Sequence, residues 1–130
     1  MKKTATALLL LVPVFLSGAA SAQKHALQVS CTDPQTQYEM NVCADRKYKA
    51  ADAELNRVYN RLASMLEDKE RAKLKATEVS WLKYRDDNCD YESSLYEGGS
   101  MRPAVYSSCM ERMTKARTAE LRGQIEEREQ

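Results

Sequence analysis

The sequence predicts an all-α fold, a small antiparallel three-helix bundle stapled by two disulfides. Glycine and proline are absent between Gln35 and Glu97, where residues of high helix propensity dominate. Apolar residues recur along this stretch at three- and four-residue spacing, the period of a helix with one buried face. The chain also holds four cysteines, an even number that suits two disulfides. Short connections between the predicted helices favour antiparallel neighbours.

The first residues predict a secretory signal peptide over 1–22. Lys2 and Lys3 precede the apolar run Ala7–Leu16, and Ala20-Ser21-Ala22 supplies small residues for cleavage after Ala22. This run is about ten residues long, whereas a membrane-spanning helix needs roughly 20. We therefore expect a periplasmic or secreted protein of residues 23–130, with no membrane insertion after signal cleavage.

The charge balance argues against nucleic acid as a partner. The full chain has 20 Lys and Arg against 19 Asp and Glu, and cleavage removes Lys2 and Lys3, which leaves 18 against 19. Such a balanced surface exerts no long-range attraction on nucleic acid or on an anionic membrane. The remaining length suits one domain. The sequence leaves the oligomeric state open.

Capping signals and periodicity predict a leader over 23–33 and helices over 34–67, 68–97 and 102–123. Two starts of the first helix stay open: Asp33-Pro34, with proline at a first helical position, and the capping box Thr36-x-x-Glu39. An apolar stripe predicts the buried face of this helix. Its members are Met40, Ala44, Tyr48, Ala51, Leu55, Val58, Tyr59, Leu62, Met65 and Leu66.

The predicted second helix has a less regular buried face, because charged residues interrupt it. Arg85 falls within the apolar face and needs a partner, since an unpaired buried charge is costly. Glu78 and Glu92, on the same line of the helix, are the candidate partners, and Trp81 can stack on the guanidinium. The predicted buried side is Leu74, Trp81, Leu82, Cys89 and Tyr96.

The third helix is predicted to begin near Pro103, after the glycine break of Gly98-Gly99. Gly123 and the polar residues that follow it predict fraying at the end of this helix. The buried side is predicted to comprise Val105, Cys109, Met113 and Ala116, widened by Tyr106, Met110 and Leu121.

The cysteines favour disulfides over a metal site. No two cysteines have Cys-x-x-Cys spacing, and the single histidine, His25, lies in a polar leader. Sequence alone permits three pairings. In an up-down-up bundle all four cysteines belong to one pole, and we favour the pairs Cys31–Cys43 and Cys89–Cys109 because they join chain neighbours without crossing the core.

No motif for catalysis or for a cofactor is present, so we predict neither an enzyme nor a metal or cofactor site. Gly98-Gly99 lies between helices and lacks the strand that precedes a nucleotide-binding loop. Asp86, Asp87 and Asp90 fit a solvated helix edge better than a cation site. Glu78 is the one candidate for a general acid, if the protein were a muramidase-like enzyme.

The loop between the second and third predicted helices is the candidate partner-binding site. With a disulfide at its base, such a loop enters a cleft at limited ordering cost. The alternative is that its glycines only end one helix and reverse the chain. The candidate binding residues are Tyr96, Gly98, Gly99, Ser100 and Arg102.

Two groups of spaced residues resemble the LprI-like lysozyme inhibitor family over nearly all of residues 23–130. The first is Cys31, Thr36-x-x-Glu39-Met40-Asn41-x-Cys43, Tyr48 and Ala51-Asp52-x-x-Leu55-Asn56-x-x-Tyr59. The second is Trp81-x-x-x-Arg85-Asp86-x-x-Cys89, Gly98-Gly99-Ser100, Cys109 and Thr114-x-x-Arg117-x-x-x-Leu121.

The resemblance implies an exported bacterial protein that binds and inhibits lysozyme. It also implies that Trp81, Arg85, Asp86 and the four cysteines form a shared framework, while it supplies no inhibitory residues. The alternative function is an envelope or secreted interaction module with a partner other than lysozyme.

Overall fold

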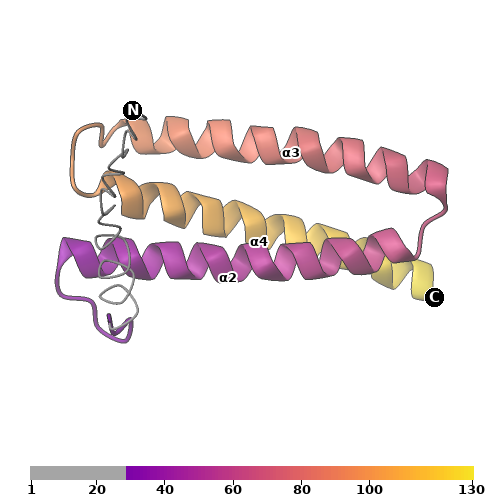
Figure 1. Cartoon of the computed structure of the whole chain (residues 1–130), viewed down its shortest axis with the longest axis horizontal. Helices are drawn as coiled ribbons and strands as arrows, with labels where there is room; N and C mark the ends of the chain where they lie inside the picture. The colour runs from indigo at the N-terminus through magenta and orange to yellow at the C-terminus, as the bar shows by residue number, and fades with distance from the viewer. Residues whose placement is uncertain (1–28) are drawn as a thin grey trace, which may run out of the picture.

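A computed structural model describes residues 29–130, which form three long helices. They are α2 (Gln37–Ser64), α3 (Asp68–Ser94) and α4 (Arg102–Glu129). Figure 1 shows them side by side, with α3 antiparallel to both α2 and α4. This confirms the predicted antiparallel three-helix bundle. The predicted signal peptide, its cleavage site and His25 lie outside the described residues.

Helix α2 begins at the capping box, which decides between the two predicted starts. The Thr36 hydroxyl accepts a hydrogen bond from the Glu39 backbone N–H, while the Glu39 carboxylate accepts from the backbone N–H of Thr36 and of Gln35. The hydrogen bonds from the Gln35 and Thr36 backbones lower the pKa of Glu39. Most residues of the apolar stripe predicted for this helix are buried or partly buried. Met40 and Met65 are exposed because they lie at the two ends of the helix.

The hydrophobic core lies mainly between α2 and α4, with Leu74 contributed by α3. Trp81 of α3 and Tyr59 of α2 pack against it while remaining partly exposed. A smaller cluster at the other end of the bundle joins the disulfide Cys89–Cys109 to Met110. The buried members of the main core are Leu55, Val58, Leu62, Leu66, Leu74, Leu121 and Ile125.

Helix α3 buries little apolar surface. Its buried residues are Leu74, Glu78, Arg85, Cys89 and Ser93. The prediction that Tyr96 lies on the buried side was wrong, because α3 ends at Ser94 and Tyr96 falls in the exposed loop that follows.

Helix α4 continues to Glu129, so the predicted fraying after Gly123 was wrong. Ile125 is buried in the core and Glu129 forms an ion pair with Arg61 of α2, which together hold the last turns in place. Ala116 is exposed rather than buried. The buried face instead includes the polar residues Thr114, Arg117 and Thr118, which hydrophobic periodicity alone does not select.

Two disulfides are formed, Cys31–Cys43 and Cys89–Cys109, as predicted. Cys89 and Cys109 are buried, whereas Cys31 is exposed. The first bridge fastens the segment before α2 to that helix, and the second joins the last turns of α3 to the first turns of α4. Within residues 29–130, no helix is both long and apolar enough to cross a membrane.

The Glu54 carboxylate lies at the contact between α2 and α4. Its ionisation should make the stability of the fold depend on pH. Hydrogen bonds from Arg57 and from Arg122 of α4 lower its pKa to about 2. Because the folded-state pKa is depressed, the stabilisation is present above the unfolded-state pKa and is lost as the pH falls toward 2. We expect Glu54→Gln to be less stable than wild type near pH 6, with the difference shrinking as the pH falls from about 4.5 to about 2.

Urea midpoints measured across this pH range test the prediction. The control is Glu127→Gln, which removes an exposed carboxylate near the end of α4. A Glu54→Gln difference that stays constant over the whole range would contradict the assignment. Because Glu54 is near the surface, the difference should also shrink in high salt.

Candidate functional site

Both disulfides and the α3–α4 loop lie at one end of the bundle, which we call the cysteine pole. The start of α2, the end of α3 and the start of α4 meet there (Figure 1). The carbonyl of Ser100 in the loop accepts a 3.0 Å hydrogen bond from the Asn41 side chain in the second turn of α2. The loop is therefore fastened to α2 as well as to the two helices that it connects.

Arg102 anchors the α3–α4 loop from within. Its guanidinium donates to Asp90 over 2.8 Å and to Glu97 over 3.2 Å. A turn closed by the bond from the Gly99 N–H to the Tyr96 carbonyl forms the loop tip. Gly98 has φ +73°, a left-handed conformation that favours glycine. Of the predicted binding residues, Arg102 is partly buried and pairs with two carboxylates of the same chain, while Tyr96, Gly98, Gly99 and Ser100 are exposed.

Six large apolar side chains at the cysteine pole are exposed, two of them, Tyr38 and Met40, at the start of α2. The other four lie in or beside the α3–α4 loop, and we call them the apolar loop patch: Tyr91, Leu95, Tyr96 and Met101. Leu95 is 87% exposed and Tyr91 is 76% exposed. Sequence reasoning selected only Tyr96. The missed signal was the spacing of Tyr84, Tyr91 and Leu95, the residue after α3, which puts three apolar side chains on one line about 100° around the helix from the buried one. Exposed apolar side chains gathered in this way are typical of interaction surfaces.

An acidic hollow of about 500 Å³ adjoins the patch. It lies between the end of α3 and the start of α4, with Tyr106 and Pro103 on the α4 side. Asp87 and Asp90 pair with Lys83 and Arg102, and both carboxylates remain largely exposed. No group of three or more potential metal ligands occurs among residues 29–130. The hollow can therefore offer partly neutralised carboxylates to a basic partner.

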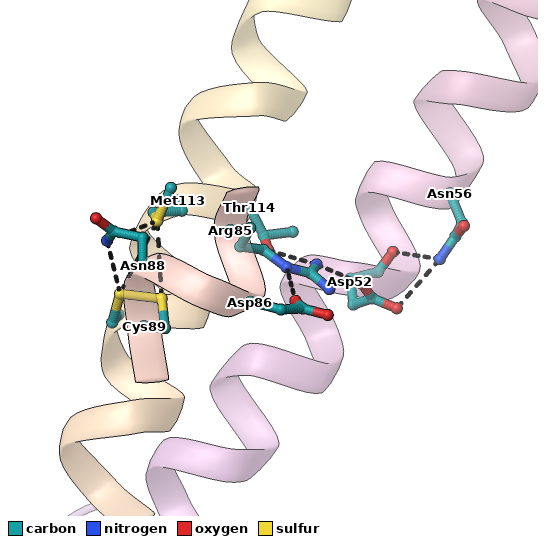
Figure 2. Close-up of polar contacts among 9 residues, drawn as sticks. Asp52, Asn56, Arg85, Asp86, Asn88, Cys89, Met113 and Thr114 are labelled. Atoms are coloured by element: carbon teal, nitrogen blue, oxygen red, sulfur yellow. Dashed lines mark hydrogen bonds and ion pairs between the residues drawn. A yellow bond between two sulfur atoms is a disulfide. The ribbon is translucent and has the colours of Figure 1, made fainter. Parts of the chain in front are cut away.

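Arg85 is buried at the centre of a polar network that links the three helices (Figure 2). It donates to Asp52 of α2, to neighbouring Asp86 and to the Thr114 hydroxyl of α4, over 3.0 to 3.2 Å. Its guanidinium lies over the rings of Trp81 and Tyr48, 5.3 and 5.5 Å from their centroids. This confirms the predicted Trp81 stacking, whereas the ion-pair partners are Asp52 and Asp86 instead of Glu78 and Glu92.

The network keeps Arg85 charged. Burial opposes the charge, but the hydrogen bonds and charges of Asp86 and Asp52 outweigh this and raise the pKa of Arg85. Burial also raises the pKa of the Tyr48 hydroxyl, an effect that the positive charge of Arg85 partly offsets.

A second buried pair, Arg117 with Glu78, joins α4 to α3. Oε2 of Glu78 accepts two hydrogen bonds from Arg117, over 2.9 and 3.0 Å, and Glu120 accepts a third over 2.9 Å. Burial opposes the Arg117 charge, but the bonds to Glu120 and Glu78 outweigh it and raise the pKa of Arg117. Glu78 is therefore a structural ion-pair residue held by Arg117.

Glu92, the other predicted partner of Arg85, instead pairs with Arg112 of α4. Hydrogen bonds from Asn88 and Arg112 lower the pKa of Glu92. The Asn88 amide also lies 3.7 Å from the Cys109 sulfur and 3.3 Å from the Met113 sulfur (Figure 2). These contacts pack the surroundings of the second disulfide.

The fold and the cysteine pole define a class of protein: a small, disulfide-stapled helical bundle that presents an anchored loop. Within that class, the chain belongs to the LprI lysozyme inhibitor family, whose model, described as "Lysozyme inhibitor LprI", matches residues 30–121. This is a family of inhibitors, and membership implies a protein partner. Asp52, Arg85, Thr114 and Arg117, four of the residues on which the resemblance in the sequence analysis rests, are members of the polar contacts described above.

The chain is also similar to a protein of Rhizobium meliloti (strain 1021) described as uncharacterized protein R02472. The two are 34% identical over 142 residues, an alignment that covers 99% of each chain. No solved structure matches the chain.

Proposed function

We propose that this protein is exported and inhibits lysozyme by placing its α3–α4 loop in the enzyme's active-site cleft. Family membership supports an inhibitor that acts through protein contact. Export is supported by the apolar N-terminal run and by the pairing of all four cysteines, since disulfides persist outside the reducing cytoplasm.

The observation that carries the proposal is the apolar loop patch on an anchored loop. Leu95 is almost fully exposed although it adjoins a disulfide-linked pair of helices and a turn held by Arg102 and Asn41. A loop whose ends are fixed before binding loses little conformational entropy on binding. Apolar side chains that become buried at the centre of an interface supply most of its binding energy.

Occlusion of the cleft explains inhibition without any chemical step. Lysozyme cuts its substrate with two carboxylates in a cleft. We assign the tip residues Gly98, Gly99 and Ser100 to the cleft, where Ser100 hydrogen-bonds toward these carboxylates, and Leu95 and Tyr96 to its rim. Arg102 does not contact the enzyme in this proposal; it stabilises the loop through its bonds to Asp90 and Glu97.

Local charge supplies the electrostatic attraction in this proposal. Many lysozymes are basic, whereas the inhibitor's overall charge is nearly balanced. The carboxylates of Asp86, Asp87 and Asp90 beside the loop therefore face the basic enzyme and orient the encounter. Such steering raises the association rate at low salt and weakens as salt is added.

A matched pair of variants tests the loop assignment. Leu95 and Met65 are the residues that follow α3 and α2, respectively, and both are exposed, but they lie at opposite ends of the bundle. We expect Leu95→Asp to weaken inhibition about 30-fold, the loss of an apolar contact at the rim of the cleft worth about 2 kcal/mol. Met65→Asp should inhibit like wild type, and both variants should keep their stability to within about 0.5 kcal/mol.

The measurement is the inhibition constant against several lysozyme types in a cell-lysis assay, with oxidised protein. A reduced and alkylated sample tests the need for the disulfides. Equal inhibition by both variants would remove the loop from the mechanism. No inhibition of any lysozyme by folded, oxidised protein would favour an interaction module with another partner.

A further inference from the structure

A groove of about 400 Å³ runs between α2 and α3, on a part of the surface distinct from the α3–α4 loop. Tyr48 and Tyr59 of α2 and Leu82 of α3 supply its apolar walls, and Asp52, Glu78 and Arg85 supply polar ones. Pockets of 300–1,000 Å³ with apolar and aromatic walls and a few convergent polar groups are the usual form of small-ligand sites. Arg85 and Glu78, which belong to the two buried ion-pair networks, both line this groove.

Among the residues that line the groove, one buried acceptor has no hydrogen-bond partner. Glu78 is 92% buried, and its Oε1 has no hydrogen-bond partner, while Oε2 takes both bonds from Arg117. A buried acceptor without a partner costs about 1–3 kcal/mol. Asp52 is less buried and, as a carboxylate, has room for further donors beside Arg85 and Asn56. Hydrogen-bond donors of a ligand therefore have an acceptor in the partly exposed Asp52 carboxylate, with Glu78 Oε1 as a second, buried one.

The charges of the groove select a neutral ligand. Asp52 and Glu78 are balanced by Arg85 and Lys75, which also line the groove, and Arg117 neutralises Glu78 from behind. An ammonium or guanidinium group would meet cations that already occupy the carboxylates. The groove therefore suits several neutral hydroxyl or amide donors.

The tyrosine rings add a requirement for an apolar face. Tyr48 and Tyr59 lie on the same side of α2, eleven positions apart, and both are partly exposed. A tyrosine ring packs against a flat apolar surface, while its hydroxyl forms hydrogen bonds. A sugar ring combines donor hydroxyls with a face of C–H groups. We propose that the α2–α3 groove is a binding site for a neutral saccharide of one to three units.

This site is independent of the proposed lysozyme contact, because it uses α2 and the middle of α3 instead of the loop. Val79 stands at its edge, 60% exposed, and Tyr84 is equally exposed on α3 but does not line the groove. Val79→Trp should therefore block the groove, while Tyr84→Trp serves as the matched control.

The test is a titration of the oxidised protein, without lysozyme, followed by backbone amide NMR shifts. The probes are the trimer of N-acetylglucosamine, the trimer of glucose, and arginine amide. We expect saturable shifts at groove residues with at least one trimer below about 10 mM, and at least a 10-fold weaker affinity for Val79→Trp with no change for Tyr84→Trp. A preference between the trimers tells whether the acetamido group is recognised.

Three results would overturn the proposal. One is the absence of saturable shifts with either trimer up to about 10 mM. Another is binding that Val79→Trp leaves intact, which would place the sugar elsewhere. The third is binding of arginine amide alone, which would assign the groove to a cationic side chain. None of these depends on whether the protein inhibits lysozyme.

Discussion

Replacing Arg117 with methionine is expected to lower the free energy of unfolding by about 3–5 kcal/mol. The loss arises because the buried Glu78 carboxylate would keep its charge but lose both hydrogen bonds from Arg117. Methionine retains the volume and the helix propensity of the stem, so packing and backbone effects stay small. Chemical denaturation at neutral pH measures the loss.

Two further variants separate the buried charge from other causes. Arg117→Met combined with Glu78→Leu removes both charges and should recover most of the loss, because well-packed apolar pairs replace buried ion pairs at little cost. Arg122→Met, on the same helix, breaks an exposed pair with Glu54 and should cost no more than about 1 kcal/mol. A double variant as unstable as Arg117→Met alone would show that the pair itself supplies the stability.

Removing the disulfide Cys89–Cys109 by changing both residues to alanine should cost about 3 kcal/mol, the loop-closure value for a separation of 20 residues. The same double change at Cys31 and Cys43, which are 12 residues apart, should cost a similar amount. Thermal or urea unfolding of the oxidised variants gives both values.

The two disulfide variants should differ in function although they are similar in stability. Only Cys89–Cys109 joins the two helices that carry the α3–α4 loop, so its removal should weaken lysozyme inhibition at temperatures where the variant is still folded. Removal of Cys31–Cys43 should leave inhibition near wild type. The opposite ranking would move the inhibitory surface to the segment before α2.

Local features of this fold could be predicted from sequence because they depend on residues close together in the chain. Thr36 and Glu39 form a capping box wherever a helix starts beside them, and Gly98 permits a turn that most residues resist. The up-down-up order places the cysteines at one pole, and the favoured pairing was the one that joins chain neighbours without crossing the core. These inferences needed no knowledge of how the helices are rotated.

The interhelical contacts could not be predicted in the same way. Arg85 was expected to pair with Glu78 or Glu92 of its own helix, whereas it pairs with its neighbour Asp86 and, across the bundle, with Asp52 of α2. Glu78 likewise meets Arg117 of α4, a residue 39 positions away. The end of α4 was misjudged because Gly123 is a weak helix former locally, while the burial of Ile125 holds the helix together.

The exposed patch was missed for a related reason. The sequence analysis placed Leu74, Trp81 and Cys89 on the buried side of α3, and the structure buries or partly buries them. Tyr84, Tyr91 and Leu95 form a second apolar line beside it. Periodicity alone does not show how far burial extends around the helix, so the exposure of this second line emerged only from the packing of the three helices.

The end of α4 offers an attachment point far from the α3–α4 loop. Helix α4 starts at the cysteine pole and ends at the opposite end of the bundle, where the C-terminus lies (Figure 1). An affinity tag, a fluorophore or a surface tether attached after Gln130 therefore projects away from the α3–α4 loop. Immobilised through that end, the protein displays the loop to a soluble enzyme without obstruction.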